Sequence, residues 1–338
     1  MDNRQWILVK RPFGEVDDQT LALRTAPVRE LADGECLIRN LYLSLDPTNR
    51  IWMSDQEQYL PPVAIGEVMR GLTIGRVVAS RNPRIKVGDP VQGVGGWQDY
   101  WIAPDGAAAK LRVEGDTPLT LYMGLLGMVG CTAYFGMLEI GNPQPGETVV
   151  VSAAAGAVGS IAVQLAKLRG ARVIGIAGSD EKCGWLIDEL GIDAAINYRR
   201  EKVRTRLREL APKGVDVYFD NTGGEILDAV LANLALNARI PLCGLISTYN
   251  ATGRGSGPAN YGAILIKRAM VKGFIILDYQ ARYGEAIRAL ADWYAQGRLK
   301  YRVDVVDGLE SAPRALGKLF DGSNQGKLVV RVAADTAH

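Results

Sequence analysis

The pattern of apolar and polar positions changes character at about residue 123. Before that point, short apolar runs alternate with turns rich in Gly, Pro, Asn and Asp, a pattern typical of a β-rich domain. Beyond it, apolar runs of strand length alternate with segments of helical period, which predicts a parallel sheet covered on both faces. We therefore expect one domain over residues 1–123, a second over 124–300, and a return of 301–338 to the first.

The β-rich part contains short strand-like runs whose spacing suggests a small, irregular barrel. Its clearest strands are predicted over 6–9, 35–39 and 74–78. The returning part is predicted to form a strand, a helix and a closing strand, over 302–306, 308–319 and 327–332. The stretch 117–138 carries no charge and has the length of a membrane span, but Pro118 and several glycines interrupt it. We interpret it as two buried helical pieces that join the domains.

The middle of the chain predicts a complete doubly wound sheet, which makes the fold class α/β. Its six strands are expected over 148–151, 172–176, 194–197, 216–220, 239–245 and 271–277. The last of these runs is apolar and would leave an exposed sheet edge, so we expect a homodimer joined through this domain.

The first of these strands leads into a turn of small residues and then into a helix over 160–168, with Gly170 at its C-terminal cap. Strand, glycine turn and helix in this order form the phosphate-binding corner of a dinucleotide fold. Gly156 lets the backbone approach a pyrophosphate, and Gly159 lets the helix pack close to the strand. Ala154 replaces the first glycine of the usual pattern, and an ordinary βα turn with small residues for packing is the alternative. The predicted contacts of this turn are Ala155, Gly156, Ala157, Val158 and Gly159.

The end of the second strand favours NADPH over NADH. Folds that bind NAD carry an acidic residue there, whereas this strand ends in Gly178 and Ser179, and Lys182 follows in the next turn. Gly178 leaves room for a 2′-phosphate, and Lys182 could pair with it, although a solvated Lys182 is the alternative. Asp180 and Glu181 would repel a phosphate if they turned inward, but the first turn of a helix is where the helix dipole favours carboxylates.

Composition and charge exclude several other functions. The chain has 338 residues, 48% hydrophobic and 22% charged, with a net charge of +2 and no basic stripe, so we expect neither a nucleic-acid nor a membrane partner. Four cysteines are dispersed, and the only histidine is His338, so no zinc ligand set and no Ser-His-Asp or Cys-His hydrolase can be assembled. Dispersed cysteines and an N-terminus without an apolar signal core predict a cytoplasmic protein.

A set of segments in order along nearly the whole chain resembles the medium-chain dehydrogenase/reductase superfamily, in its zinc-free branch of prostaglandin, alkenal and curcumin reductases. The segments are 43–50, 88–93, 96–100, 153–160, 177–182, 219–224, 243–250 and 324–327. The resemblance implies a Rossmann-type sheet plus a GroES-like barrel. It also implies an NADPH-dependent reductase of carbon–carbon double bonds conjugated to a carbonyl, acting on a small enone or enal.

The same resemblance implies further cofactor contacts beyond the phosphate turn. Core packing or turn chemistry is the alternative for each of them, above all for Phe274 and Ile276, which fall in the predicted last strand. Besides Gly178, Ser179 and Lys182, the expected contacts are Met128, Thr132, Tyr198, Asn221, Cys243, Tyr249, Phe274, Ile275, Ile276 and Asn324.

Reduction of an enone needs hydride at the β-carbon, a donor for the enolate oxygen and a proton for the α-carbon. Tyr249 is the first candidate donor, with the alternative that it anchors its own loop. Tyr59 lies in the loop 55–62, which resembles the family's substrate-side finger. Asn49 and Arg50 are expected to face the cleft, although Arg50 could instead hold the domain together.

One departure from the family concerns the proton. Ile266 stands where several relatives carry a tyrosine before a basic pair, so solvent or a cofactor ribose hydroxyl could supply the proton instead. Two other functions stay open at this point. One is an NADPH-dependent quinone reductase of the same superfamily, and the other is a non-catalytic NADPH-binding protein.

Overall fold

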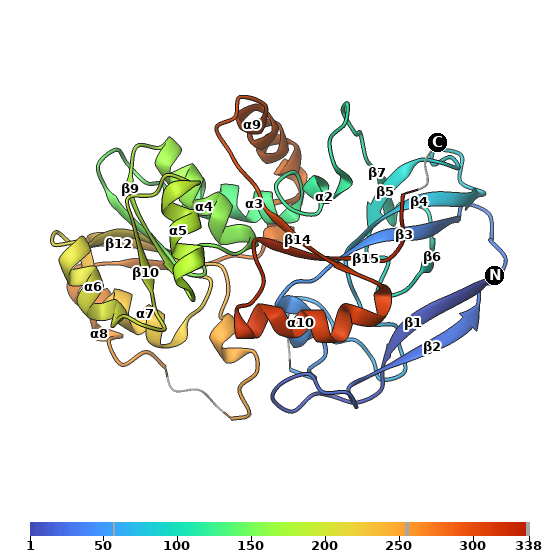
Figure 1. The fold of residues 1–338 in the computed structure, drawn as a ribbon, viewed down its shortest axis with the longest axis horizontal. Helices are drawn as coiled ribbons and strands as arrows, with labels where there is room; N and C mark the ends of the chain where they lie inside the picture. The colour runs from blue at the N-terminus through green and yellow to red at the C-terminus, as the bar shows by residue number, and fades with distance from the viewer. Residues whose placement is uncertain (57, 254–256, 336–338) are drawn as a thin grey trace. The chain divides into compact units, whose positions relative to one another are not determined.

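The computed structural model describes residues 1–56, 58–253 and 257–335, and the chain divides into two compact units (Figure 1). The N-terminal unit contains residues 1–123, 303–324 and those from 328 on. The central unit contains residues 124–302 and 325–327. His338 and position 57 of the predicted substrate-side loop lie outside the described residues.

The central unit is built on a six-stranded sheet in which neighbouring strands are parallel. The strand order is β10-β9-β8-β11-β12-β13, so the direction of winding reverses between β8 and β11. This is the predicted doubly wound sheet, and ligands bind in such sheets at the carboxyl ends of the strands beside that reversal. The strands are β8 Thr148–Val151, β9 Arg172–Ala177, β10 Ala194–Asn197, β11 Val215–Phe219, β12 Leu234–Leu242 and β13 Met270–Gly273.

Helices cover this sheet through apolar faces. Leu207 of α6 and Val230 of α7 are fully buried and pack with Ile174 and Tyr218 of the sheet, and Ile264 of α8 packs against the same cluster. The α-helices of the unit are α3 Met128–Tyr134, α4 Ala157–Leu168, α5 Asp180–Asp188, α6 Val203–Leu210, α7 Gly224–Leu231, α8 Gly262–Lys267 and α9 Tyr283–Ala295. The unit also has a π-helix, η1 Phe135–Gly141, and two 3₁₀ helices, η2 Ile246–Thr248 and η3 Ile276–Arg282.

The uncharged stretch 117–138 forms two helical pieces, α2 (Leu119–Tyr122) and α3, and the second runs on into η1. Leu121, Val129 and Phe135 are buried along it. Within the described part of the chain, the longest apolar helices fall short of what crossing a bilayer requires.

The N-terminal unit contains a seven-stranded sheet and a separate hairpin, β1–β2. The sheet runs β14-β15-β3-β4-β5-β7, with β6 also paired to β3, and β15 lies antiparallel to β3. Leu8, Leu43, Trp97 and Leu316 lie in one core cluster, so the returning helix α10 supplies part of the core. The strands are β1 Asp2–Leu8, β2 Leu21–Pro27, β3 Cys36–Ser44, β4 Thr73–Ser80, β5 Pro90–Gly93, β6 Tyr100–Ala103, β7 Ala108–Lys110, β14 Val303–Asp307 and β15 Lys327–Arg331. The helices are α1 Thr48–Trp52, α2, η4 Leu309–Ser311 and α10 Ala312–Asp321.

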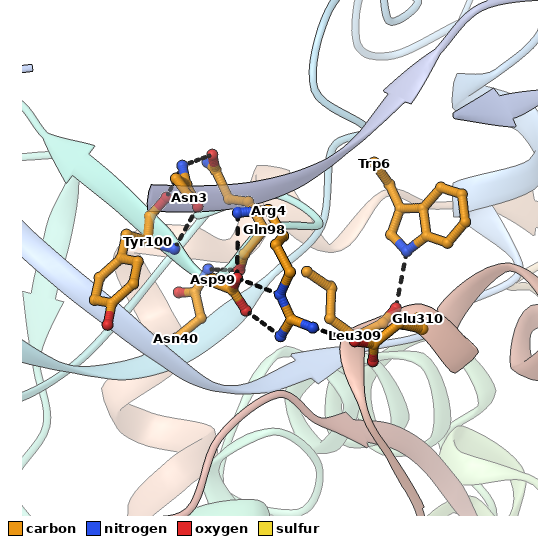
Figure 2. A network of polar contacts seen from close by, with 9 residues as sticks. All are labelled: Asn3, Arg4, Trp6, Asn40, Gln98, Asp99, Tyr100, Leu309 and Glu310. Carbon is orange, nitrogen blue, oxygen red and sulfur yellow. Dashed lines mark hydrogen bonds and ion pairs between the residues drawn. The ribbon is translucent and has the colours of Figure 1, made fainter. Parts of the chain in front are cut away.

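A polar network fastens the returning segment to the first strand (Figure 2). The indole N–H of Trp6 donates to the Leu309 carbonyl at 2.8 Å. Arg4 binds both carboxylate oxygens of Asp99, at 2.7 and 2.9 Å, and also pairs with Glu310. The hydrogen bond to Asp99 raises the pKa of Arg4. Two side chains of β1 therefore bind residues of η4 within the same unit.

The last strand is shorter than predicted. β13 ends at Gly273, whereas the apolar run suggested a strand over 271–277. The register explains the difference, because Gly273 is opposite Leu242, the last residue of β12, and no strand lies further along to accept hydrogen bonds. The Phe274 ring instead lies edge-on to Phe219, and η3 begins at Ile276. Phe274 and Ile276 are half-buried residues outside the strand, so the alternative that they are core residues of the last strand is wrong.

The fifth strand is displaced from its predicted position. β12 covers Leu234–Leu242, so it begins before and ends before the expected 239–245. Its pairing with β11 shifts register, and Asn237 within it has a φ of +60°. A residue in the left-handed region inside a strand marks an irregularity that alternation of apolar residues does not predict.

Candidate functional site

The turn between β8 and α4 has the geometry of an anion site. α4 begins at Ala157, and its N-cap residue, Gly156, contributes no side chain to cap it. The first N–H groups of a helix have no partner within the helix, and the helix dipole places positive charge there. The N-terminus of α4 is therefore suited to hold a phosphate group.

Two glycines of the turn approach one carbonyl, and only at Gly159 does the approach exclude a side chain. A Cβ atom at Gly159 would lie 2.2 Å from the Ala153 oxygen, and one at Gly156 would lie 3.1 Å from it. Ala153 itself has a φ of +46°. Ala154 stands where the pattern has its first glycine, but it is fully buried and its N–H donates to the Ile176 carbonyl at 3.0 Å. Its methyl group therefore fills the interior rather than the surface of the turn.

The segment 325–327 lies against this turn. The Gly326 N–H donates to the Ala155 carbonyl at 3.2 Å, and the Gln325 amide donates to Glu181 at 2.5 Å. Asn324, a predicted contact, immediately precedes this segment and is 7% exposed. Sequence reasoning missed Gln325 and Gly326, although both belong to the segment 324–327 that it quoted.

The carboxyl ends of β9 and β10 meet at Gly178. A Cβ atom there would lie 3.1 Å from the Tyr198 hydroxyl, so the missing side chain leaves room for that ring. Ser179 caps α5 by accepting a hydrogen bond from the Lys182 N–H at 3.2 Å, and the Lys182 side chain is half-buried.

The carboxylates nearby are held by their own neighbours. Asp180 accepts a hydrogen bond from Asn197 at 2.6 Å and pairs with Arg200, while Glu181 binds Gln325. This arrangement is the one expected of residues in the first turn of α5. Sequence reasoning missed Arg199, whose guanidinium lies 5.9 Å from the Tyr198 ring centre. Two arginines directly after the third strand were the signal that could have identified it.

Polar residues join the ends of β8 and β11 where the winding reverses. The Asn221 side chain donates to the Ser152 carbonyl at 2.7 Å, and its backbone N–H donates to the Ser152 hydroxyl at 2.9 Å. Asp220 is fully buried and accepts hydrogen bonds from Tyr218, Thr222 and Gly223. Burial raises the pKa of Asp220, and these donors oppose that rise.

Cys243 follows β12 on the same edge of the sheet. Burial, together with the nearby Asp220 charge, raises the pKa of its thiol to about 12. The thiol is therefore protonated at neutral pH and is not a nucleophile.

Tyr249 follows η2 and is half-buried. Its hydroxyl oxygen accepts a hydrogen bond from the Leu245 N–H at 3.1 Å, which is the loop contact expected if Tyr249 anchors its own loop. Accepting that bond leaves the hydroxyl hydrogen available to donate. Burial raises the pKa of Tyr249, so the phenol stays protonated well above neutral pH.

The remaining predicted contacts of the central unit lie on α3 and around η3. On α3, the Thr132 hydroxyl donates to the Met128 carbonyl at 2.8 Å. The carbonyls of Ile275 and Ile276 accept hydrogen bonds from the Asp278 N–H and the Tyr283 hydroxyl, each at 3.1 Å. Ile276 begins η3, so its carbonyl also takes part in the helix, whereas the second lone pair of the Ile275 oxygen remains for a ligand amide.

The N-terminal unit carries the predicted substrate-side residues. Asn49 is 1% exposed, and its amide binds the Asp46 N–H and the Arg70 carbonyl. Arg50 is 4% exposed and donates to the Gly14 and Pro12 carbonyls, the arrangement expected if it holds the domain together. Tyr59, in contrast, is 39% exposed.

Two family profiles match this chain. One, described as the N-terminal domain of oxidoreductase, matches residues 4–111, and one described as zinc-binding dehydrogenase matches 157–292. The zinc in the second description does not fit the residues present, because the described residues contain no group of three or more His, Cys, Asp or Glu side chains placed to hold a metal ion. No step of the proposed chemistry therefore passes through a metal.

Relatives that align with nearly the whole chain identify the kind of oxidoreductase. The chain is 44% identical to the NADPH-dependent curcumin reductase of Escherichia coli, with 98% of both chains covered. It is 39% identical to the NADP(+)-dependent 2-alkenal reductase of Nicotiana tabacum, with 99% of both covered. The crystal structure of CurA from Vibrio vulnificus in complex with NADPH shares 44% identity and a TM-score of 0.94, covering 98% of this chain and 100% of that one.

The fold and the site thus define a dinucleotide-binding oxidoreductase. The chain belongs to the medium-chain dehydrogenase/reductase superfamily, in the branch of the curcumin, alkenal and prostaglandin reductases.

Proposed function

We propose that this protein is an NADPH-dependent reductase of the carbon–carbon double bond of α,β-unsaturated ketones and aldehydes that needs no metal. The proposal depends on two features at the carboxyl ends of the strands. One is the N-terminus of α4, which no side chain caps. The other is the Tyr249 phenol, whose hydrogen has no acceptor among the described residues. The curcumin and alkenal reductases that resemble the whole chain support it.

Bound NADPH supplies the hydride that reaches the β-carbon of the substrate. The N-terminus of α4 holds the pyrophosphate, and Lys182 with Tyr198 binds the 2′-phosphate. Tyr249 donates its hydroxyl hydrogen to the enolate oxygen as negative charge develops there. The α-carbon takes its proton from solvent or from a ribose hydroxyl of the cofactor.

The test is an NADPH-oxidation screen over enones, enals, quinones and saturated aldehydes, repeated after exhaustive chelation. We expect turnover of enones and enals, identification of the saturated carbonyl product, and no loss on chelation. Turnover of quinones alone would replace the proposal by a quinone reductase, and tight NADPH binding without turnover of any class would indicate a non-catalytic protein.

The Lys182→Ala variant is expected to bind NADPH roughly ten- to a hundredfold more weakly, the loss of one charge-assisted contact. NADH, which lacks the 2′-phosphate, should bind as it does to the wild-type protein. Calorimetric titration with both cofactors measures the difference. A matched control is Lys167→Ala, because that lysine pairs with Asp193; equal weakening of both cofactors by Lys182→Ala would refute the assignment.

We also propose that the protein is a cytoplasmic homodimer joined along β13. The support is an edge strand with exposed apolar side chains, Met270 and Val271, beside the exposed Leu265 and Ile266 of α8. The four cysteines are unpaired, as a reducing compartment requires.

Light scattering should give twice the chain mass of 36.5 kDa at micromolar concentration. Val271→Glu should shift the protein toward the monomer because it places charge in the interface. Val305→Glu is the control, since Val305 is equally exposed on β14, at 41% against 42% for Val271. A wild-type protein that scatters as a monomer would exclude the dimer.

A further inference from the structure

Arg70 holds a half-buried positive charge that has no carboxylate within ion-pair distance among the described residues. Its guanidinium donates one hydrogen bond, to the Pro61 carbonyl at 2.8 Å, and lies 5.4 Å from the centre of the Trp52 ring. A guanidinium offers five N–H donors, so most of those of Arg70 remain for other partners.

Arg50 provides a comparison within the same unit. Burial lowers the pKa of both arginines. Arg50 compensates for burial with hydrogen bonds from Nε and Nη2 to the Gly14 carbonyl, at 2.9 and 2.7 Å, and with a third bond to Pro12. Arg70 has a single carbonyl partner. A partly desolvated charge without compensation is unfavourable, which points to an anion that binds there.

The surroundings of Arg70 belong to the predicted substrate-side loop. The Gln58 amide donates to the Ile51 carbonyl at 2.5 Å, and the Val63 N–H donates to the Trp52 carbonyl at 2.9 Å, so the loop is tied back onto α1. Burial lowers the pKa of Arg70, and its interaction with Tyr59 in this loop partly opposes that lowering.

Unsatisfied polar atoms lie in the same region. The Trp52 indole nitrogen and the Gln58 side-chain oxygen are both buried, and neither has a hydrogen-bond partner among the described residues. One is a donor and the other an acceptor. Buried polar atoms without partners are uncommon in native proteins and are frequently satisfied by water or a ligand.

We propose that Arg70 is a specificity-determining residue that binds a carboxylate on the substrate, so that the enzyme favours enones with an anionic tail over neutral ones. This inference rests on the proposed function, because it takes the Tyr59 loop to line the substrate. The Trp52 ring contacts the Arg70 guanidinium by a cation–π interaction, and the hydrogen bond to the Pro61 carbonyl orients that guanidinium. The remaining N–H groups present the paired donors that a carboxylate binds.

The test compares an enone that carries a terminal carboxylate with its methyl ester. In the wild-type enzyme the acid should have the higher kcat/KM. Arg70→Met should lower kcat/KM for the acid roughly ten- to a hundredfold, mainly through KM, and change that of the ester by less than about threefold. Arg70→Lys should keep part of the preference for the acid, because lysine retains the charge but lacks the paired N–H donors of the guanidinium.

Arg11→Met is the matched control. Arg11 donates to the carbonyls of Met53 and Val63 at the two ends of the same loop. Its replacement therefore disturbs the loop and removes one positive charge, as Arg70→Met does. The ratio of acid to ester should stay at the wild-type value in this variant. Equal losses for acid and ester in Arg70→Met, or an unchanged ratio, would overturn the proposal and leave Arg70 as a support of the loop.

A binding measurement separates this inference from the proposed function. Calorimetry with the saturated keto acid and its ester requires no turnover, so it reports on Arg70 even if no enone oxidises NADPH. Weaker binding of the acid alone in Arg70→Met supports the carboxylate site. Binding of acid and ester that does not differ between the wild-type protein and the variant contradicts it.

Discussion

Tyr249→Phe is expected to lower kcat by about 10²–10³, the loss that follows removal of one donor to a developing oxyanion. Phenylalanine keeps the packing of the half-buried ring and removes only the hydroxyl that accepts from Leu245. Because burial raises the pKa of Tyr249, the donor should remain protonated across the neutral range. We therefore expect kcat of the wild-type enzyme to show no alkaline loss from this group below about pH 10, the pKa of an unperturbed tyrosine.

The contrary outcome is equally definite. If Tyr249 only anchors its loop, the variant should be less stable or have a higher KM for the cofactor. Its kcat should then stay within about threefold of wild type, a much smaller change than removal of an oxyanion donor causes. Tyr294→Phe is the control, because that tyrosine is 40% exposed on α9. Should Tyr59→Phe also turn over normally, water or the cofactor would be the proton source.

Gly159→Ala is expected both to destabilise the protein and to weaken NADPH and NADH together. The added Cβ would lie 2.2 Å from the Ala153 carbonyl oxygen and 2.9 Å from both the Ala153 carbonyl carbon and the Ala154 Cα. Because all three are backbone atoms, α4 would have to move away from the turn. Overpacking of this kind costs about 1–3 kcal/mol, occasionally more. If the cofactor needs the original position of the helix, the same energy appears as a roughly ten- to a hundredfold loss of affinity.

Gly184→Ala is the matched control for that substitution. Gly184 lies inside α5, and its added Cβ would meet only the Asp188 side chain, at 3.7 Å. Alanine is favoured over glycine within a helix by about 0.5–1 kcal/mol, so this variant should be slightly more stable. Thermal unfolding and cofactor titration of the two variants measure both effects. A Gly159→Ala protein as stable and as tightly bound to NADPH as wild type would disprove the close packing.

The alternation of apolar runs identified the six-stranded sheet because the central strands are buried on both faces. β8 occupies 148–151 as predicted, since four β-favouring residues are bounded by a charged turn and a glycine turn. β13 was predicted too long for a reason that composition cannot reveal. Ile275 and Ile276 favour strands, but β12 ends opposite Gly273 and leaves them no partner.

Some residues of the candidate site could also be found from the sequence, and others could not. Residues of the phosphate turn and of strand ends could be found from the sequence, because their position follows from the order of strand, turn and helix. Arg50 and Asn49 could not be judged, since their partners, the carbonyls of Gly14 and Arg70, are distant in sequence. Arg70 was missed for a related reason, because what distinguishes it is a missing partner and a ring contact, neither of which leaves a pattern along the chain.

The interrupted N-terminal unit has a consequence for how the chain is made. β3 pairs with β15 through Val329 and Ser44, and the Trp6 indole donates a hydrogen bond to Leu309, so these partners leave the ribosome only after residues 124–302 of the central unit. Domains generally fold as units while the chain emerges, and the central unit has its six strands available before β15 exists. Translation of the N-terminal unit therefore begins before that of the central unit and ends after it. Until β15 is made, the backbone of Tyr42 to Ser44 in β3 lacks its strand partner, and an unpaired strand edge of this kind exposes the nascent chain to aggregation.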